Sequence, residues 1–247
     1  MFAGNMSDNV FMENIYDNYY TMEYYYNNVP GQGPCRNNLI YTSLISKDKK
    51  TFCQWYYNDT EYHKGNNQVV DPAKMEEKWL REVNYLTQLR NAYPDLSPKL
   101  TNIDLESRKL FLEIDGPDFW ERARCDAANY DSVLPDWQDQ MLEIIQAHKS
   151  LGFHKYSMHP SSYFVVGGKL KSINYFFTYR DTEPNISIKE VESHIYSTRQ
   201  DEMRKHLDTL GIEWDKPQPW SVMDQLCWAS FSTNYPVEFI ERVKCLK

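Results

Sequence analysis

The chain has 247 residues, a formal net charge of -8 and a hydrophobic content of 41%. A chain of this length can bury one sizeable core. Its acidity argues against binding to the phosphate backbone of nucleic acid and against adhesion to an anionic membrane surface. We therefore expect a single folded protein that binds neither nucleic acid nor a membrane.

Five cysteines are scattered along the chain without a C-x-x-C pair, a pattern typical of free thiols in a reducing compartment. No stretch approaches the roughly 18 uninterrupted apolar residues of a membrane span. The first residues lack the basic and apolar regions of a signal peptide. These features predict a cytoplasmic protein.

Residues 1–30 are acidic and rich in Asn and Tyr, which predicts a polar arm or an irregular first strand. The next segment, Gly31-Gln-Gly33, lies between Pro30 and Pro34. Because each proline removes a backbone donor that a phosphate-binding loop would need, we interpret this segment as a turn.

Two runs of β-branched and aromatic residues follow, at 38–46 and 51–58, and the polar turn between them predicts an antiparallel hairpin. Asp71-Pro72 then marks the start of a helix that extends to about Arg90. At 100° per residue, one arc of this helix is apolar: Met75, Trp79, Val83, Leu86 and Leu89. Glu82 falls inside that arc, so its carboxylate is expected to point inward.

The remaining elements are mostly helical. We expect a short strand over 109–116, a helix over 136–151, and a hairpin over 163–176 around a Gly-Gly turn. Further helices are expected over 188–210, 220–231 and 237–244. This order predicts an α+β fold with the arm 1–30, a small β-rich lobe with one helix at 31–116, and a mainly helical lobe at 117–247.

Three segments in this order resemble those of the protein-kinase-like superfamily, especially its compact lipopolysaccharide-kinase-like and aminoglycoside-phosphotransferase-like members. WLREVNYLTQL resembles the kinase helix C, and Glu82 resembles the glutamate of that helix. LFLEIDG resembles the strand and hinge that hold adenine, and HPSSYFVVGGKLKSINYF resembles the catalytic loop, hairpin and metal-binding strand end. The resemblance spans about residues 28–232 and implies a two-lobed kinase-like fold.

The third segment departs from that pattern at each chemically important position. Ser157 stands where a kinase has its catalytic Asp, Ser162 where it has the loop Asn, and Asn174 where it has the metal-binding Asp. The position of the phosphate-binding lysine falls near Gln54 or Trp55, and neither is a cation. Since phosphoryl transfer needs these groups to hold Mg²⁺ and orient the nucleophile, the resemblance implies a pseudokinase without a metal site.

We therefore expect a catalytically inactive kinase-like protein that needs no cofactor and acts as a binding module or scaffold for a protein partner. The first alternative is an atypical phosphotransferase that uses ATP and magnesium and recruits displaced residues such as Glu82, Asp181 or Asn174. Its nucleotide would be held by some of Gly31, Gly33, Glu82, Glu113, Asp115 and Asn174.

The second alternative is a virion-associated structural protein that reuses the fold. The abundance of Asn and Tyr resembles that of proteins from AT-rich bacterial viruses, which implies a location in the host cytoplasm or the virion.

Other residues admit more than one interpretation. Glu82 could equally be a carboxylate at a helix edge that finds a basic or backbone partner. His148, His154 and His159 lack the spacing of metal ligands, so we favour core or loop histidines. Aromatic residues near the C-terminus predict core packing, with a partner-binding patch as the alternative: Trp214, Trp220, Trp228, Phe231 and Tyr235.

Overall fold

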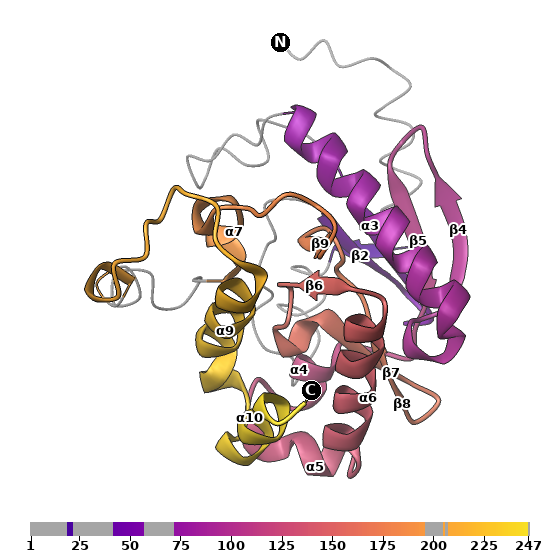
Figure 1. Ribbon diagram of the computed structural model, residues 1–247. Coiled ribbons are helices and arrows are strands. Elements are labelled where there is room, and N and C mark those ends of the chain that lie inside the picture. The colour runs from indigo at the N-terminus through magenta and orange to yellow at the C-terminus, as the bar shows by residue number, and fades with distance from the viewer. Residues whose placement is uncertain (1–18, 22–41, 57–71, 196–204, 206, 247) are drawn as a thin grey trace, which may run out of the picture.

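The computed structural model describes residues 19–21, 42–56, 72–195, 205 and 207–246. Most of the predicted arm 1–30 lies outside these residues, as do Gly31 and Gly33 and their predicted turn. The fold below is that of the described part of the chain. Figure 1 shows its elements in sequence colours.

A five-stranded antiparallel sheet forms the first half of the described fold, in the order β1-β2-β3-β5-β4. Its strands are β1 (Tyr19–Thr21), β2 (Thr42–Ser46), β3 (Thr51–Trp55), β4 (Leu100–Asp104) and β5 (Lys109–Glu113). The predicted hairpin is present as β2 and β3, within tighter bounds. The sequence analysis did not predict β4. This is an edge strand whose residues are all exposed or half-buried, so its polar and apolar residues do not alternate.

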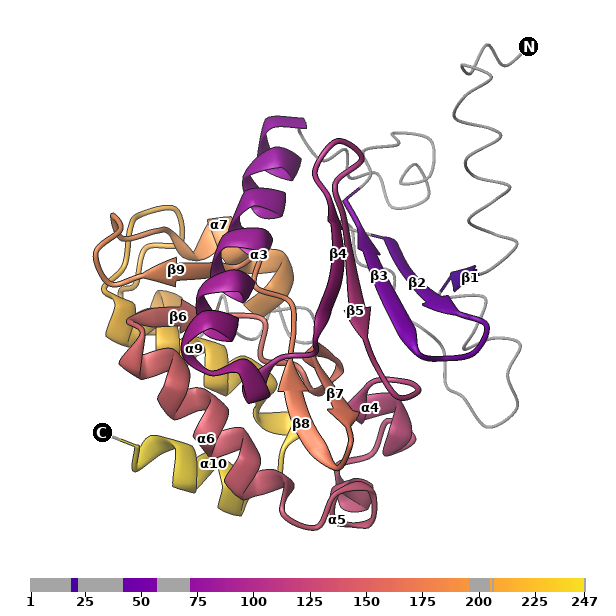
Figure 2. The same cartoon turned by 90° about the vertical axis from the view of Figure 1, so that its right-hand side faces the viewer.

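Helix α3 (Pro72–Ala92) packs along one face of this sheet, as Figure 2 shows. Four members of its predicted apolar arc are buried, namely Met75, Trp79, Leu86 and Leu89, and Val83 is partly buried against the same core. Glu82 is also fully buried. The inward orientation predicted for this carboxylate is thus confirmed.

Two small sheets connect this half of the protein to the helices. β6 (Phe153–Lys155) pairs with β9 (Thr178–Arg180), and β7 (Tyr163–Val166) pairs with β8 (Lys169–Ser172). Gly167 and Gly168 link β7 to β8 with φ values of 59° and 73°, which suits glycine and gives a tight hairpin turn. The predicted Gly-Gly hairpin is therefore confirmed.

Helices make up most of the second half of the chain. They are α4 (Phe119–Arg122), α5 (Tyr130–Val133), α6 (Trp137–Ser150), α7 (Ile188–Ile195), α9 (Trp220–Phe231) and α10 (Val237–Lys244). The predicted bounds of α9 and α10 agree with the structure, whereas much of the predicted helix over 188–210 lies outside the described residues. α6 and α9 lie on either side of β6, and α10 lies below these two helices (Figure 1). The fold class is α+β, as predicted.

The aromatic residues near the C-terminus contribute to the main core. Phe231 and Tyr235 are buried, while Trp214, Trp220 and Trp228 are partly buried and pack against that core. This burial supports core packing over a partner-binding patch. None of the helices in the described ranges is long and apolar enough to cross a membrane.

Candidate functional site

Glu82 occupies the junction between α3 and the segment that follows β8. Its Oε2 accepts hydrogen bonds from the backbone N–H of Tyr175 and from the Tyr56 hydroxyl, the latter at 3.2 Å. Burial raises the pKa of Glu82 to about 7, although these hydrogen bonds and the nearby Lys155 ammonium oppose that rise. Glu82 therefore keeps its proton through much of the acidic range.

Gln54, Asn174 and Ser162 form a buried hydrogen-bonded chain beside Glu82. Gln54 Nε2 donates to Asn174 Oδ1 at 2.7 Å, and Asn174 Nδ2 donates to Ser162 Oγ at 2.9 Å. The exposed fractions of these residues are 0%, 4% and 2%. Three neutral groups thus meet where the kinase resemblance places a lysine, a metal-binding carboxylate and a loop asparagine.

The backbone holds this chain of amides in place. Asn174 has a φ of 66°, in the left-handed region that Asn tolerates better than most residues. Ser162 ends the short turn η4 (Pro160–Ser162), and its backbone carbonyl accepts a hydrogen bond from the N–H of Ile173 at 2.9 Å. The loop and the end of the hairpin are therefore joined by both backbone and side-chain hydrogen bonds.

Strand alternation decides between Gln54 and Trp55. Trp55 packs with Leu44 and Cys53 in a separate apolar cluster, whereas Gln54 reaches Asn174. Because neighbouring strand residues point to opposite faces, only one of the two can face the buried amide chain. That residue is Gln54.

Ser157 is fully buried on the segment that leads into η4. Its backbone carbonyl accepts a hydrogen bond from the Lys155 ammonium. Within the part of the chain that the structure describes, Ser157 Oγ, Gln54 Oε1 and Glu82 Oε1 have no hydrogen-bond partner.

Lys155 is the site residue that the sequence analysis missed. Its ammonium lies 5.4 Å from the ring centre of Tyr163 and 5.3 Å from that of Tyr175, and burial lowers its pKa to about 7 against the opposing effect of Glu82. The available signal was alternation in β6, since Phe153 and Lys155 share a strand face and Phe153 is an obvious core residue.

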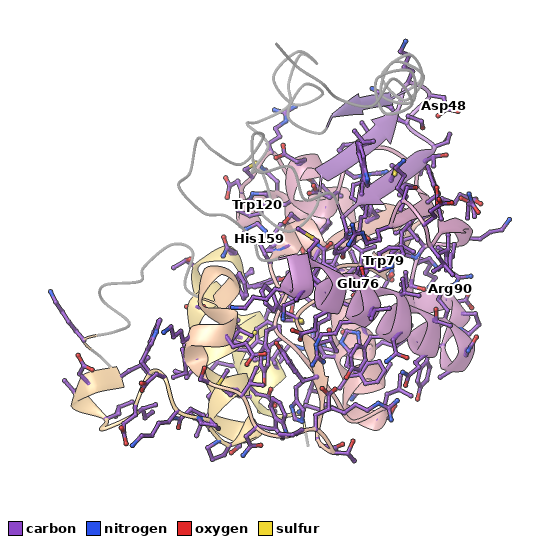
Figure 3. All side chains as sticks on the ribbon, turned by 90° about the horizontal axis from the view of Figure 1, so that it is seen from above. Asp48, Glu76, Trp79, Arg90, Trp120 and His159 are labelled. Atoms are coloured by element: carbon purple, nitrogen blue, oxygen red, sulfur yellow. The ribbon has the colours of Figure 1, made fainter. Side chains whose placement is uncertain are left out.

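The histidines fall in different surroundings. His148 lies buried on α6, with Nε2 at 3.1 Å from the Tyr175 hydroxyl, and burial together with the Lys155 charge holds its pKa well below the usual range. His159 accepts a hydrogen bond from the N–H of Ser161 and contacts Trp120 edge-on at 5.3 Å (Figure 3). Both agree with core or loop histidines.

The segment from Glu113, at the end of β5, to Gly116 is the part that the kinase resemblance treats as a hinge, and three of its backbone donors are used within the protein. The N–H of Glu113 donates to Lys99 O, that of Ile114 to Lys50 O and that of Gly116 to Lys49 O, at 2.8 to 2.9 Å.

The two carboxylates of this segment are exposed and pair with lysines: Glu113 with Lys99 at 3.7 Å and Asp115 with Lys50 at 2.5 Å. An adenine ring recognised by these backbone amides would have to replace existing hydrogen bonds.

A column of stacked planar groups connects α3 to the helices. The Arg81 guanidinium lies 4.2 Å from the ring centre of Tyr179, whose ring lies 5.8 Å from that of Trp220. Trp220 in turn stacks on His154 at 4.7 Å, with 10° between the planes. Arg81 also contacts Glu183 at 2.9 Å.

Asp181, another residue considered for a displaced catalytic role, is exposed in the turn beside Gly152. Its backbone N–H donates to the Gly152 carbonyl at 3.2 Å. A Cβ at Gly152 would lie 2.8 Å from Asp181 Oδ1, so the two residues are tightly packed. The structure thus assigns Asp181 to a turn, whereas Glu82 and Asn174 belong to the buried site.

The described residues thus form an α+β protein whose buried polar site joins a small antiparallel sheet to a helical part. No protein-family model and no curated protein matches the sequence.

Among solved structures, the chain is similar to WbdD bound to the kinase inhibitor LY294002, with 13% identity and a TM-score of 0.38. A second WbdD structure gives 12% identity and a TM-score of 0.39. Each match covers 85% of this chain, which spans about half the length of the WbdD chains, 47% and 49%.

Proposed function

We propose that this chain is a catalytically inactive kinase-like protein that serves as a binding module or scaffold for a protein partner. The observation that carries the proposal is the buried chain of Gln54, Asn174 and Ser162. In a two-lobed kinase-like arrangement, these three side chains would occupy the interlobe position at which phosphates and metal are bound.

The residues present do not fit a magnesium ion. Magnesium prefers anionic oxygen ligands, and the side chains of Gln54, Asn174 and Ser162 carry no charge. The side-chain oxygen of Asn174, Oδ1, could serve as a ligand, but it already accepts a hydrogen bond from Gln54 Nε2 at 2.7 Å. Metal binding would have to break that bond and leave the buried Gln54 amide without its acceptor, at a cost of about 1–3 kcal/mol.

The proton-accepting group of a kinase also lacks an equivalent. Ser157 is buried, and a serine hydroxyl does not take a proton near neutral pH. Glu82 is the nearby carboxyl, but its Oε2 is bound to Tyr175 and Tyr56. These contacts favour a structural role for Glu82 over recruitment to catalysis.

ATP with magnesium should leave the thermal unfolding temperature unchanged. A ligand at a hundred times its dissociation constant stabilises the folded state by about 2.7 kcal/mol, which would raise that temperature visibly. We would measure unfolding by differential scanning fluorimetry with magnesium alone, with ATP alone and with both. A rise that requires both ligands, accompanied by phosphate transfer to an acceptor, would refute the proposal in favour of an atypical phosphotransferase.

The proposed partner is a protein. A location in the cytoplasm or the virion, and a viral source, remain predictions from composition. Co-purification of this chain at fixed stoichiometry with virion proteins, lost on deletion of residues 1–30, would instead favour the structural role. A defined one-to-one complex that survives the same deletion would favour the binding module.

A further inference from the structure

A cavity of about 680 Å³ lies among α6, β6, α9 and α10, apart from the buried amide chain. Its volume is in the range of small-molecule sites, which are about 300–1,000 Å³. Most of its walls are apolar and come from all four elements, including Ile145, Phe153, Trp228, Ile240 and Val243. Such walls suit a hydrocarbon chain.

The rim of the cavity is cationic, in a chain whose net charge is -8. Lys149 at the end of α6 and Lys244 at the end of α10 both line it and are exposed. Their present partners are weak ones: Lys149 donates to the Leu246 carbonyl at 2.8 Å, and Lys244 pairs with the exposed Glu241 at 2.7 Å. An incoming anion could therefore recruit either ammonium at little cost.

One carboxylate among the described lining residues, Asp224, offsets this charge only in part. Asp224 lies 3.1 Å from His154 Nδ1, so its oxygens are directed to the imidazole. In the described ranges, the other charged groups of the lining are Lys149, Lys155 and Lys244. The lining thus combines apolar walls with an excess of positive charge.

We propose that this cavity binds a single-chain amphipathic carboxylate, of the fatty-acid class, with its hydrocarbon tail among the three helices and its carboxylate at the rim formed by Lys149 and Lys244. The cavity shares Lys155 with the candidate site but is lined by none of Gln54, Asn174 and Ser162. Failure of this binding proposal would leave the proposed function untouched. Failure of the proposed function would likewise leave this binding proposal untouched.

The test uses the full chain and a dansylated undecanoate, whose fluorescence rises when it enters an apolar site. Below its micellar concentration, this probe should bind in saturable fashion, and decanoate should displace it better than decylamine or decanol does. The double variant Lys149→Glu/Lys244→Glu should weaken carboxylate binding by about tenfold, because two exposed attractive charges become repulsive. Both positions are exposed, so the variant is expected to fold.

Matched controls are available in the same chain. Lys216 is exposed and pairs with Glu213 three residues earlier, as Lys244 pairs with Glu241, so Lys216→Glu should leave binding unchanged. Ala229→Trp at the cavity rim should block the probe, whereas Ser221→Trp, at an exposed position on the same helix, should not.

Three results would each overturn the proposal. They are absence of saturable binding, equal displacement by decylamine and decanoate, and equal loss of binding in the Lys216 control.

Discussion

Replacing Asn174 with aspartate should lower the free energy of unfolding by about 3–5 kcal/mol, the usual cost of an uncompensated buried charge. The side chain is 4% exposed, and its oxygen faces the Gln54 amide at 2.7 Å. Urea denaturation at neutral pH would measure the change. Asn84→Asp is the matched control, because Asn84 also accepts from a glutamine amide, Gln88 Nε2 at 2.8 Å, but is exposed on α3. That change should cost less than about 0.5 kcal/mol.

The geometry further predicts that Gln54→Lys rescues Asn174→Asp. Lysine alone at position 54 should also destabilise by about 3–5 kcal/mol, whereas the double variant pairs the new ammonium with the new carboxylate. We expect a coupling energy of at least about 2 kcal/mol between the two positions in a double-mutant cycle. Additive losses in the cycle would show that the two side chains do not meet and would remove the central observation of the proposed function.

Stability should pass through a minimum near pH 7 because of Glu82 and Lys155. The folded-state pKa of Glu82 is about 7 and its ordinary value is 4.5, so the unfolded chain releases this proton first and stability falls as pH rises from 4.5 to 7. The folded-state pKa of Lys155 is about 7 against an ordinary 10.5, so stability rises again between pH 7 and 10.5.

Each limb of this curve depends mainly on one residue, although Glu82 and Lys155 oppose each other's pKa shift, so removing either residue should also move the other limb. Glu82→Gln should flatten the acidic limb, which amounts to about 3 kcal/mol at roughly 1.4 kcal/mol per pKa unit, and Lys155→Met should flatten the alkaline limb. Urea denaturation at half-unit pH intervals would measure both. The exposed Glu76 of α3 gives the control Glu76→Gln, which should keep the wild-type curve. Curves for wild type and Glu82→Gln that run parallel between pH 4.5 and 7 would contradict this account.

Local sequence signals predicted the elements that have strong periodicity or turn chemistry. Gly167-Gly168 predicted one hairpin, the apolar arc of α3 placed Glu82 inside, and the predicted bounds of α9 and α10 agree with the structure. β6 and β9 have three residues each, too few for a periodic pattern, and they pair across a gap of more than twenty residues. Their pairing depends on tertiary packing that no local window contains.

The site was predictable only in part, for the same reason. The resemblance picked out Ser157, Ser162 and Asn174, but it left Gln54 and Trp55 as equal choices until the pairing of β3 with its neighbours was known. The hydrogen bond between Gln54 and Asn174 joins residues 120 positions apart. The burial of Lys155 was missed because lysine is normally exposed, and the kinase-like roles of Glu113, Asp115, Gly31 and Gly33 stay predictions.

The stacked column from Arg81 through Tyr179 and Trp220 to His154 has a mechanical consequence. Enzymes that transfer phosphate open and close around each substrate, and a cross-brace of this kind would resist such hinge motion. A protein that only presents a surface benefits from the same brace, because a rigid surface loses less conformational entropy when a partner docks. In the proposed binding role, this rigidity would lower the entropic cost of association.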